Sequence, residues 1–275
     1  MELQDKVCLI AGASGAIGAS VARRFFQEGA RLALTYRTER PGVSAKDHRD
    51  DTGRIAYYKL DVTDYDATEL VVRQVLETFS SLDVLVNCTG IVGPIGPLET
   101  LDIRAWARTI ETNLIGSVHL ARAVIPVMKG RGGGKIVLFS GGGAAYGRPF
   151  FTPYSSSKAA VVRFTESLAD ELEPANIQVN AVAPGPVNSG MWAEMRAAGG
   201  LGGSALLSEI KKMDQSGGAS PDRAAGLAVF LASRRSNRLT GRLLSAIWDD
   251  WEHLENHMGK IASSDVWTLR RIPLR

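Results

Sequence analysis

A tyrosine and a lysine one helical turn apart are the residues of this sequence best suited to moving a proton. Tyr154 and Lys158 stand in the segment "PYSSSK", and positions i and i+4 of a helix lie on one face, so that the two side chains project together. A phenol has an ordinary pKa of about 10, and a nearby positive charge lowers that pKa toward neutrality. The pair can therefore give a proton to a carbonyl oxygen or take one from an alcohol.

The elements that must position this pair follow from the hydrophobic pattern. Apolar segments of strand length alternate with amphipathic segments of helix length, and the strands are apolar nearly throughout, which predicts a parallel sheet covered by helices on both faces. Right-handed crossovers make this a doubly wound, Rossmann-like α/β fold of about seven strands. We expect strands at 6–12, 31–36, 54–62, 82–90, 134–141, 177–185 and 241–247, and helices at 15–29, 67–79, 103–128, 153–173 and 220–233.

Four of these strands end in segments rich in glycine and small polar residues: "AGASGAIG", "NCTG", "SGGG" and "APGPVNSG". Ligands of doubly wound sheets bind outside the carboxyl ends of the strands. The first segment also opens a helix, where backbone N–H groups can cradle a pyrophosphate. The sequence therefore predicts that a dinucleotide binds along Gly12, Ser14, Gly15, Ile17 and Gly18.

Taken together, these motifs resemble the classical short-chain dehydrogenases/reductases (SDR) over roughly residues 3–247. The family's T-G-x-x-x-G-x-G motif falls on Ala11, Gly12, Ala16 and Gly18, with alanine in place of the threonine and of the middle glycine. The other matching positions are the D-V pair Asp61 and Val62, the N-N-A-G counterpart with Asn87 and Gly90, the helix asparagine Asn113, the pair Tyr154 and Lys158, and the loop with Pro184, Gly185, Val187 and Ser189.

The resemblance implies an NAD(P)-dependent oxidoreductase that interconverts a secondary alcohol and a ketone. In this family the counterpart of Tyr154 is the acid or base, and that of Lys158 tunes it and holds the nicotinamide ribose. The counterpart of Asn113 anchors a water that relays the proton. The counterparts of Asp61 and Val62 contact adenine, and the loop 184–189 contacts the nicotinamide.

The end of the second strand bears on the choice of cofactor. An acidic residue there binds the ribose 2′-hydroxyl of NAD, whereas an arginine accepts the 2′-phosphate of NADP. Tyr36 occupies the usual acidic position, and Arg37 follows it. This favours NADP, and NAD remains the alternative because Arg37 can also be a solvated turn residue.

The family's catalytic serine is the one element out of place. Counting back 13 residues from Tyr154 gives Gly141, and Ser140 lies one position earlier. Because strand side chains alternate between faces, such an offset normally points the hydroxyl away. Three alternatives follow: Ser140 reaches the site through a twisted loop, backbone N–H groups of Gly141 to Gly143 replace it, or the protein is a catalytically weak, cofactor-sensing binding protein. The second alternative predicts that Gly141→Ser is tolerated.

The overall composition is typical of a soluble globular protein, and we expect it to reside in the cytoplasm. Hydrophobic residues make up 45% and charged residues 22%, and the net charge of +3 gives no reason to expect a nucleic-acid partner. We expect no membrane span or leader, because no long uncharged apolar run occurs. The histidines form no cluster, and Cys8 and Cys88 lie in apolar strands, so we expect no metal and no disulfide.

Two segments fall outside the repeating pattern. We interpret 190–220, which is rich in glycine, as a substrate lid within a single domain of residues 1–247. Residues 248–275 contain three of the five tryptophans, so we expect this extension to pack on the body or on a partner subunit. The expected substrate is a sugar or polyol, with 3-oxoacyl-thioester reduction as the alternative. The resemblance also implies a homodimer or homotetramer.

Overall fold

Seven strands form one parallel sheet, in the order β3-β2-β1-β4-β5-β6-β7. Every strand runs parallel to its neighbours, which confirms the doubly wound α/β fold expected from the sequence. The computed structural model describes residues 1–39 and 53–272. The strands are β1 (Val7–Ala11), β2 (Arg31–Tyr36), β3 (Ile55–Lys59), β4 (Val84–Asn87), β5 (Gly134–Phe139), β6 (Ile177–Ala183) and β7 (Leu243–Ser245).

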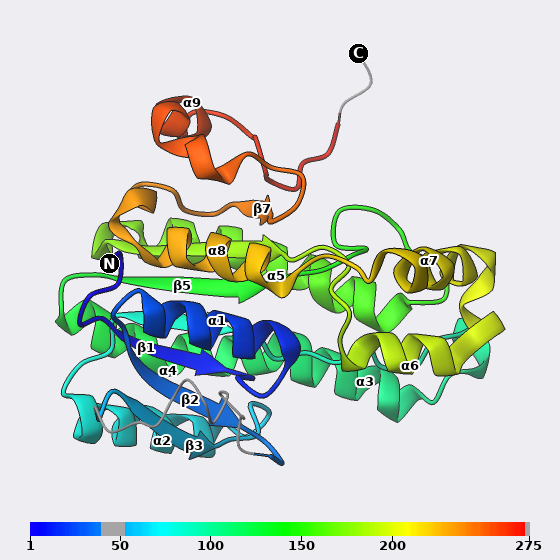
Figure 1. Cartoon of the computed structure of the whole chain (residues 1–275), viewed down its shortest axis with the longest axis horizontal. Coiled ribbons are helices and arrows are strands. Elements are labelled where there is room, and N and C mark those ends of the chain that lie inside the picture. Colours follow the sequence, from blue (N-terminus) through cyan, green and yellow to red (C-terminus); the bar gives the residue numbers. More distant parts are fainter. Residues whose placement is uncertain (40–52, 273–275) are drawn as a thin grey trace.

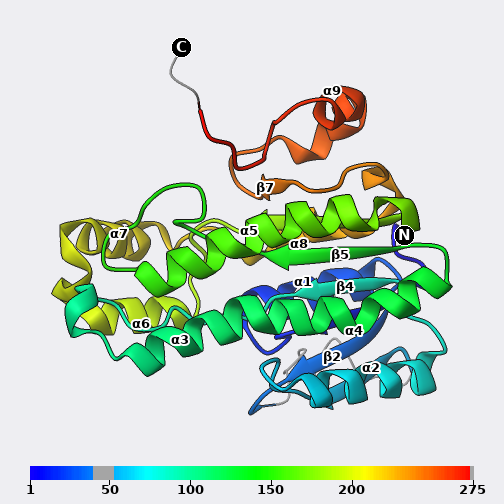
Figure 2. The same cartoon turned by 180° about the vertical axis from the view of Figure 1, so that it is seen from behind.

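Helices cover both faces of this sheet because the strands are apolar on both sides. Figure 1 shows α1 (Ala16–Gln27) and α8 (Pro221–Ala232) on one face, where their buried side chains form one core cluster with the strands. Figure 2 shows α2 (Tyr65–Phe79), α4 (Gly116–Gly130) and α5 (Thr152–Leu172) on the other face, over a second cluster.

The long helix expected at 103–128 is interrupted. It consists of α3 (Ile103–Ile110), a π-helical turn (Glu111–Ile115) and α4. Such turns are frequent at functional sites, and this one contains Asn113. Close packing accounts for the glycine that begins α4: a Cβ atom at Gly116 would lie only 2.5 Å from the Cγ2 atom of Val62.

The segment interpreted as a glycine-rich lid is helical. It folds into α6 (Gly190–Ala198) and α7 (Gly203–Ser216), which lie beyond the carboxyl ends of the strands (Figure 1). The glycines are confined to helix ends: Gly199 and Gly203 both have positive φ values, which glycine adopts without strain. Buried side chains of the two helices (Trp192, Met195, Leu206 and Met213) pack with Phe151 and Tyr154 in a third cluster. That the segment moves as a lid stays a prediction.

The C-terminal segment lies against β7 and α8 and carries one more helix, α9 (Met258–Ala262). Trp251, Leu254 and Ile261 are buried in the core cluster beneath α8. The Trp251 ring sits close over Gly226, where a Cβ atom would lie 3.1 Å from it. These contacts place the segment on the body of its own chain.

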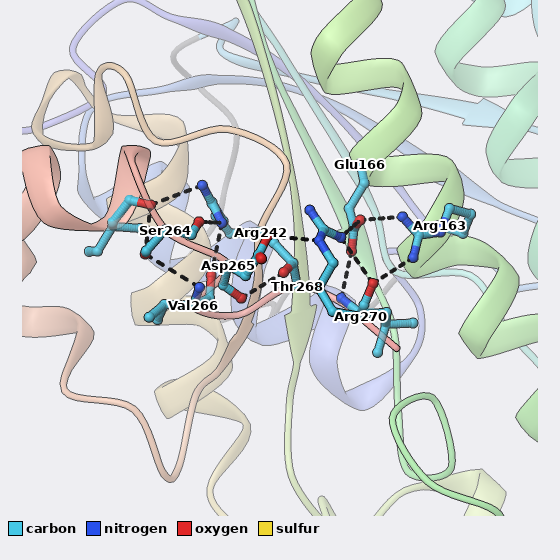
Figure 3. A network of polar contacts seen from close by, with 10 residues as sticks. Arg163, Glu166, Arg242, Ser264, Asp265, Val266, Thr268 and Arg270 are labelled. Carbon is cyan, nitrogen blue, oxygen red and sulfur yellow. Dashed lines mark hydrogen bonds and ion pairs between the residues drawn. The ribbon is translucent and has the colours of Figure 1, made fainter. Parts of the chain in front are cut away.

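Polar contacts tie the same segment to the strands and to α5 (Figure 3). The Arg242 guanidinium donates to the carbonyl oxygens of Ile261, Ser264 and Val266 at 2.7–3.0 Å, and so satisfies acceptors at and just beyond the end of α9. On α5, the buried Glu166 accepts from Arg270 at 2.7 Å. The last described residues are therefore anchored to the helix that carries Tyr154 and Lys158.

Candidate active site

Tyr154 and Lys158 lie on α5 and are almost completely buried, with 7% and 3% of their surfaces exposed. Proline at the start of α5 favours this helix boundary, because its missing N–H is not needed in the first turn. Both side chains line a cavity of about 410 Å³. The Lys158 ammonium donates to the carbonyl oxygen of Phe139 at 3.0 Å and lies 5.8 Å from the centre of the Tyr154 ring.

Burial dominates the electrostatics of the pair. It raises the pKa of Tyr154, and the positive charge that opposes this rise belongs to Arg148. The spacing of Tyr154 and Lys158 in the sequence predicts that Lys158 has this effect, so the structure corrects the source of the charge. Burial lowers the pKa of Lys158 to about 8, against an opposing effect of Cys88. Lys158 therefore carries most of its charge at neutral pH and loses it in mildly alkaline solution.

Asn113 connects three elements at the π-helical turn. Its side-chain oxygen accepts from the backbone N–H of Ile91 at 2.8 Å, and its amide nitrogen donates to the carbonyl of Ile91 and to the Ser157 hydroxyl, both at 2.9 Å. Its own carbonyl accepts from Ser117 at 2.7 Å. The side chain thus holds α5 against the loop after β4, and a role in relaying a proton through water stays a prediction.

The Ser140 hydroxyl is directed at the main chain of α5. It is buried and donates to the carbonyl oxygen of Lys158 at 3.2 Å. This geometry does not favour the alternative in which Ser140 binds the substrate oxygen.

The neighbouring glycine has no room for a side chain. A Cβ atom at Gly141 would overlap the Tyr154 hydroxyl, so the expectation that Gly141→Ser is tolerated is wrong unless the tyrosine moves. Within the described residues, the backbone N–H groups of Gly141, Gly142 and Gly143 donate to no acceptor. The structure thus leaves backbone donors beside the phenol, as the second alternative requires.

The first glycine loop fits a pyrophosphate. Gly12 has a φ of +74°, and a Cβ atom there would lie 3.0 Å from Thr89; a Cβ atom at Gly18 would overlap the carbonyl of Gly12. Ser14 and Gly15 are exposed at the start of α1, and no side chain caps this helix. The N–H groups of its first turn are therefore available to an anion.

The adenosine end of the predicted site lies at the carboxyl ends of β2 and β3. Burial acts to raise the pKa of Asp61, but hydrogen bonds from the backbone and hydroxyl of Thr63 outweigh it, and Arg37 also helps to hold that pKa below its usual value. Arg37 is exposed, while Val62 is buried against Gly116. Arg37 thus lies within electrostatic reach of Asp61 and is open to solvent.

The predicted nicotinamide end of the site adjoins Tyr154 and Lys158. Ile17 and the predicted loop residues Pro184, Gly185, Val187 and Ser189 line the same cavity as Tyr154. Asn87 is buried and accepts from the backbone and hydroxyl of Thr89, which shapes the loop after β4. At Gly90 a Cβ atom would lie 3.2 Å from the Lys158 ammonium and 3.3 Å from the Asn113 oxygen, so a larger residue would crowd both.

The cavity also contains residues that the sequence-based interpretation missed. Arg148, from the loop between β5 and α5, lines it together with Glu209 of α7 and Trp248 of the C-terminal segment. A signal existed for the first of these, because Arg148 is the only charged residue between Lys135 and Lys158. For Glu209 and Trp248 the sequence held no signal, since only the tertiary fold brings their segments to the cavity.

The described residues contain neither a metal-ligand cluster nor a membrane-spanning helix. In residues 1–39 and 53–272, no three His, Cys, Asp or Glu side chains gather as metal ligands. In the same part of the chain, no helix has the length and apolar character needed to cross a membrane.

Comparisons with known proteins agree with this geometry. The model of the short chain dehydrogenase family matches residues 6–199. The chain is 34% identical to the 3-oxoacyl-[acyl-carrier-protein] reductase FabG of Thermotoga maritima, over 89% of this chain and 97% of the relative. It is 33% identical to galactitol 2-dehydrogenase of Agrobacterium fabrum, over 91% and 99% of the two chains.

Solved structures show the same likeness. A variant of the actinorhodin polyketide ketoreductase, solved with NADPH, superposes with a TM-score of 0.79 at 29% identity, over 88% of this chain and 95% of that one. These matches confirm the resemblance and the nicotinamide cofactor expected from the motifs. The chain belongs to the short-chain dehydrogenases, a family of NAD(P)-dependent oxidoreductases that act on alcohol and keto groups.

Proposed function

We propose that this enzyme uses NADP to interconvert a ketone and a secondary alcohol on a compact small molecule. The observation that carries the proposal is that one cavity of about 410 Å³ unites Tyr154, Lys158 and the predicted nicotinamide loop. The exposed Arg37 supports NADP, because the described end of β2 offers it to a 2′-phosphate and places no carboxylate before it.

Each residue of the site has its own role in the proposed reaction. NADPH, when bound, supplies the hydride for reduction. The Tyr154 hydroxyl donates its proton to the carbonyl oxygen, and backbone N–H groups beside Gly141 stabilise the charge that develops there. The charged Lys158 would hold the ribose, and the nearby charge of Arg148 favours the phenolate left behind. In oxidation Tyr154 takes the proton back.

The lining of the cavity bears on the substrate. Most of it is carbon, from residues such as Ala144, Met191, Trp192, Met195 and Met213. Each hydroxyl of a polyol needs a hydrogen-bonding partner when it is buried. Likeness to galactitol dehydrogenase supports the sugar or polyol expected from the sequence, but the lining supports a keto group on a mostly apolar skeleton more strongly.

A second candidate is a 3-oxoacyl-thioester reductase. The likeness to FabG supports it, and the three methionines of the lining are flexible side chains that adapt to an acyl chain. Acetoacetyl-CoA, a cyclic ketone and galactitol, each followed by nicotinamide absorbance with NADP(H) and NAD(H), distinguish the substrates and the cofactors.

Tyr154→Phe tests the proposal. We expect turnover to fall by about 10²- to 10⁴-fold, while NADPH binding, measured by fluorescence titration, is retained. Tyr65→Phe is the control, because this half-buried tyrosine at the start of α2 donates only to Glu69 and does not line the cavity. Unchanged turnover in Tyr154→Phe would contradict the role of Tyr154 in proton transfer. A wild-type protein that binds NADPH but reduces no ketone would favour the cofactor-sensing alternative.

Assembly as a homodimer or homotetramer and residence in the cytoplasm stay predictions. Sedimentation of the purified chain tests the first.

A further inference from the structure

Arg148 is held in place by three elements around the cavity. Its guanidinium carbon lies 3.8 Å above the Phe151 ring, Nη2 forms an ion pair with Glu209 of α7, and the same nitrogen lies 3.9 Å from the sulfur of Met195 on α6. Only 14% of the side chain is exposed. The position of the charge is therefore fixed by packing.

The guanidinium nevertheless has donors to spare. Among the described residues, only Nη2 has acceptors, and Nε and Nη1 have none. In the described part of the chain, neither nitrogen is a buried atom without a partner, so both are reached from the open cavity and are available to a ligand. Nη1 lies 4.0 Å from the place of a Cβ atom on Gly142, and the adjoining Gly141 abuts the Tyr154 hydroxyl. The unpaired side of Arg148 thus lies along the glycine run that borders the phenol.

The cavity also carries a surplus of positive charge. Arg148, Lys158 and Lys212 line it, and Glu209 is the only carboxylate among its described lining residues. If Lys158 holds the ribose, the two remaining cations, Arg148 and Lys212, still outnumber the single carboxylate of Glu209. A cleft of one sign attracts ligands of the opposite sign.

We propose that Arg148 binds a carboxylate of the substrate, so that the enzyme acts on oxo acids and hydroxy acids with an apolar skeleton. The proposal rests on the function proposed above and names the class of its substrate. A guanidinium suits a carboxylate because it offers several fixed N–H donors. Glu209 then competes with the substrate for Arg148.

The competing interpretation is that the pair of Arg148 and Glu209 only fastens α7 to the loop after β5. The two interpretations predict opposite effects of Glu209→Gln on the binding of acids. Under our proposal, Arg148→Gln weakens the binding of acids, and Glu209→Gln strengthens it, because a competing charge is lost. If the ion pair only fastens α7 to the loop, both variants weaken the binding of charged and neutral ligands alike.

The experiment compares 4-oxocyclohexanecarboxylate with its methyl ester, followed by NADPH oxidation. We expect the acid-to-ester ratio of kcat/KM to fall by about 10- to 100-fold in Arg148→Gln, mainly through KM. The ratio cancels any effect of the Arg148 charge on Tyr154. Arg196→Gln is the control, because it breaks an ion pair with Asp214 that joins α6 and α7 outside the cavity.

Binding gives a readout that needs no turnover. Calorimetric titration of the NADP-loaded protein with cyclohexanecarboxylate is expected to give a Kd about 10- to 100-fold higher in Arg148→Gln and a lower Kd in Glu209→Gln. Retained NADP binding shows that each variant is folded.

Distinct results overturn the two proposals. A wild-type enzyme that reduces the ester as well as the acid, or an Arg148→Gln variant with an unchanged ratio and Kd, overturns the carboxylate site and leaves the reductase intact. If neither the two probes nor the ketones of the first panel consume NADPH, the reductase function itself fails. Equal weakening in Arg148→Gln and Glu209→Gln supports fastening and also overturns the carboxylate site.

Discussion

Two buried lysines lie near opposite ends of β5, and their surroundings differ. Lys135 stands at the amino end of the strand with 9% of its surface exposed, and Lys158 contacts the carbonyl of Phe139 at the carboxyl end. Burial lowers the pKa of both ammonium groups to about 8. The cost of burying the charge is thus similar at the two ends.

The hydrogen-bond partners of the two ammonium groups differ. Lys135 donates to the Ser236 hydroxyl at 3.2 Å and to the Asn237 side chain at 3.0 Å, beside a polar cavity of about 610 Å³. In the described part of the chain Lys158 has one hydrogen-bond acceptor, and it faces the cavity shared with Tyr154. Of the three donors of each ammonium, Lys135 uses two on side chains and so serves the structure, whereas Lys158 uses one and keeps two for a ligand of the cavity.

Replacing each lysine by methionine tests this contrast most directly. Lys158→Met is expected to reduce turnover by about 10²-fold, because it removes the cation proposed to position the ribose beside Tyr154. Lys135→Met is expected to leave turnover unchanged, since distant sites act independently. Steady-state kinetics on any accepted ketone measures both. Comparable losses in the two variants would remove the distinction between the ends of β5.

The next largest loss of turnover is expected from a substitution in the glycine run after the carboxyl end of β5. Gly141→Ala places a methyl group against the Tyr154 hydroxyl, and misplacing a reacting group by about 1 Å costs about 10²-fold in rate. Gly147→Ala, in the same loop, meets no atom within 4 Å and serves as the control. Turnover at the wild-type level in Gly141→Ala would show that the phenol has another productive position.

At the amino end of β5, replacing Lys135 is expected to change the free energy of unfolding and not turnover. The pKa of Lys135 is about 8 in the folded protein and about 10.4 when unfolded. Below about pH 8 both states hold the proton; between these pKa values the unfolded state binds more protons, so the free energy of unfolding rises with pH. Lys135→Met removes the contribution of Lys135 to this rise, and the like contribution of Lys158 remains. Urea titrations at about pH 7 and about pH 10 measure it, with the exposed Lys129→Met as control. An equal pH dependence in wild type and Lys135→Met would contradict the burial of a charged lysine.

The smallest effect is expected at Ser140. Because its hydroxyl bonds to the main chain of α5, Ser140→Ala should cost about 1 kcal/mol of stability and leave turnover nearly unchanged. Thermal unfolding and kinetics check the two parts. A loss of about 10²-fold in turnover would restore Ser140 as the donor to the substrate.

Much of the fold was predictable because it depends on local patterns. The bounds of β2 agree with the apolar run 31–36, and α5 begins within one residue of its expected start. The convergence of the glycine segments was also predictable, since parallel strands bring their carboxyl ends to one edge of the sheet. Glycine content misled the interpretation of 190–220, because it does not show that the glycines lie only at helix ends.

The sequence by itself determined the doubly wound sheet, the dinucleotide-binding loop and the pairing of Tyr154 with Lys158, because hydrophobic period, glycine position and helical spacing are properties of short segments. The resemblance of its motifs to a known family implied that the dinucleotide is a nicotinamide cofactor. Only the tertiary structure decided which way the Ser140 hydroxyl points, that position 141 has no room for a side chain, and that Arg148 meets Glu209 across the cavity. These features depend on contacts between segments far apart in the chain, and no local pattern encodes the distance between them.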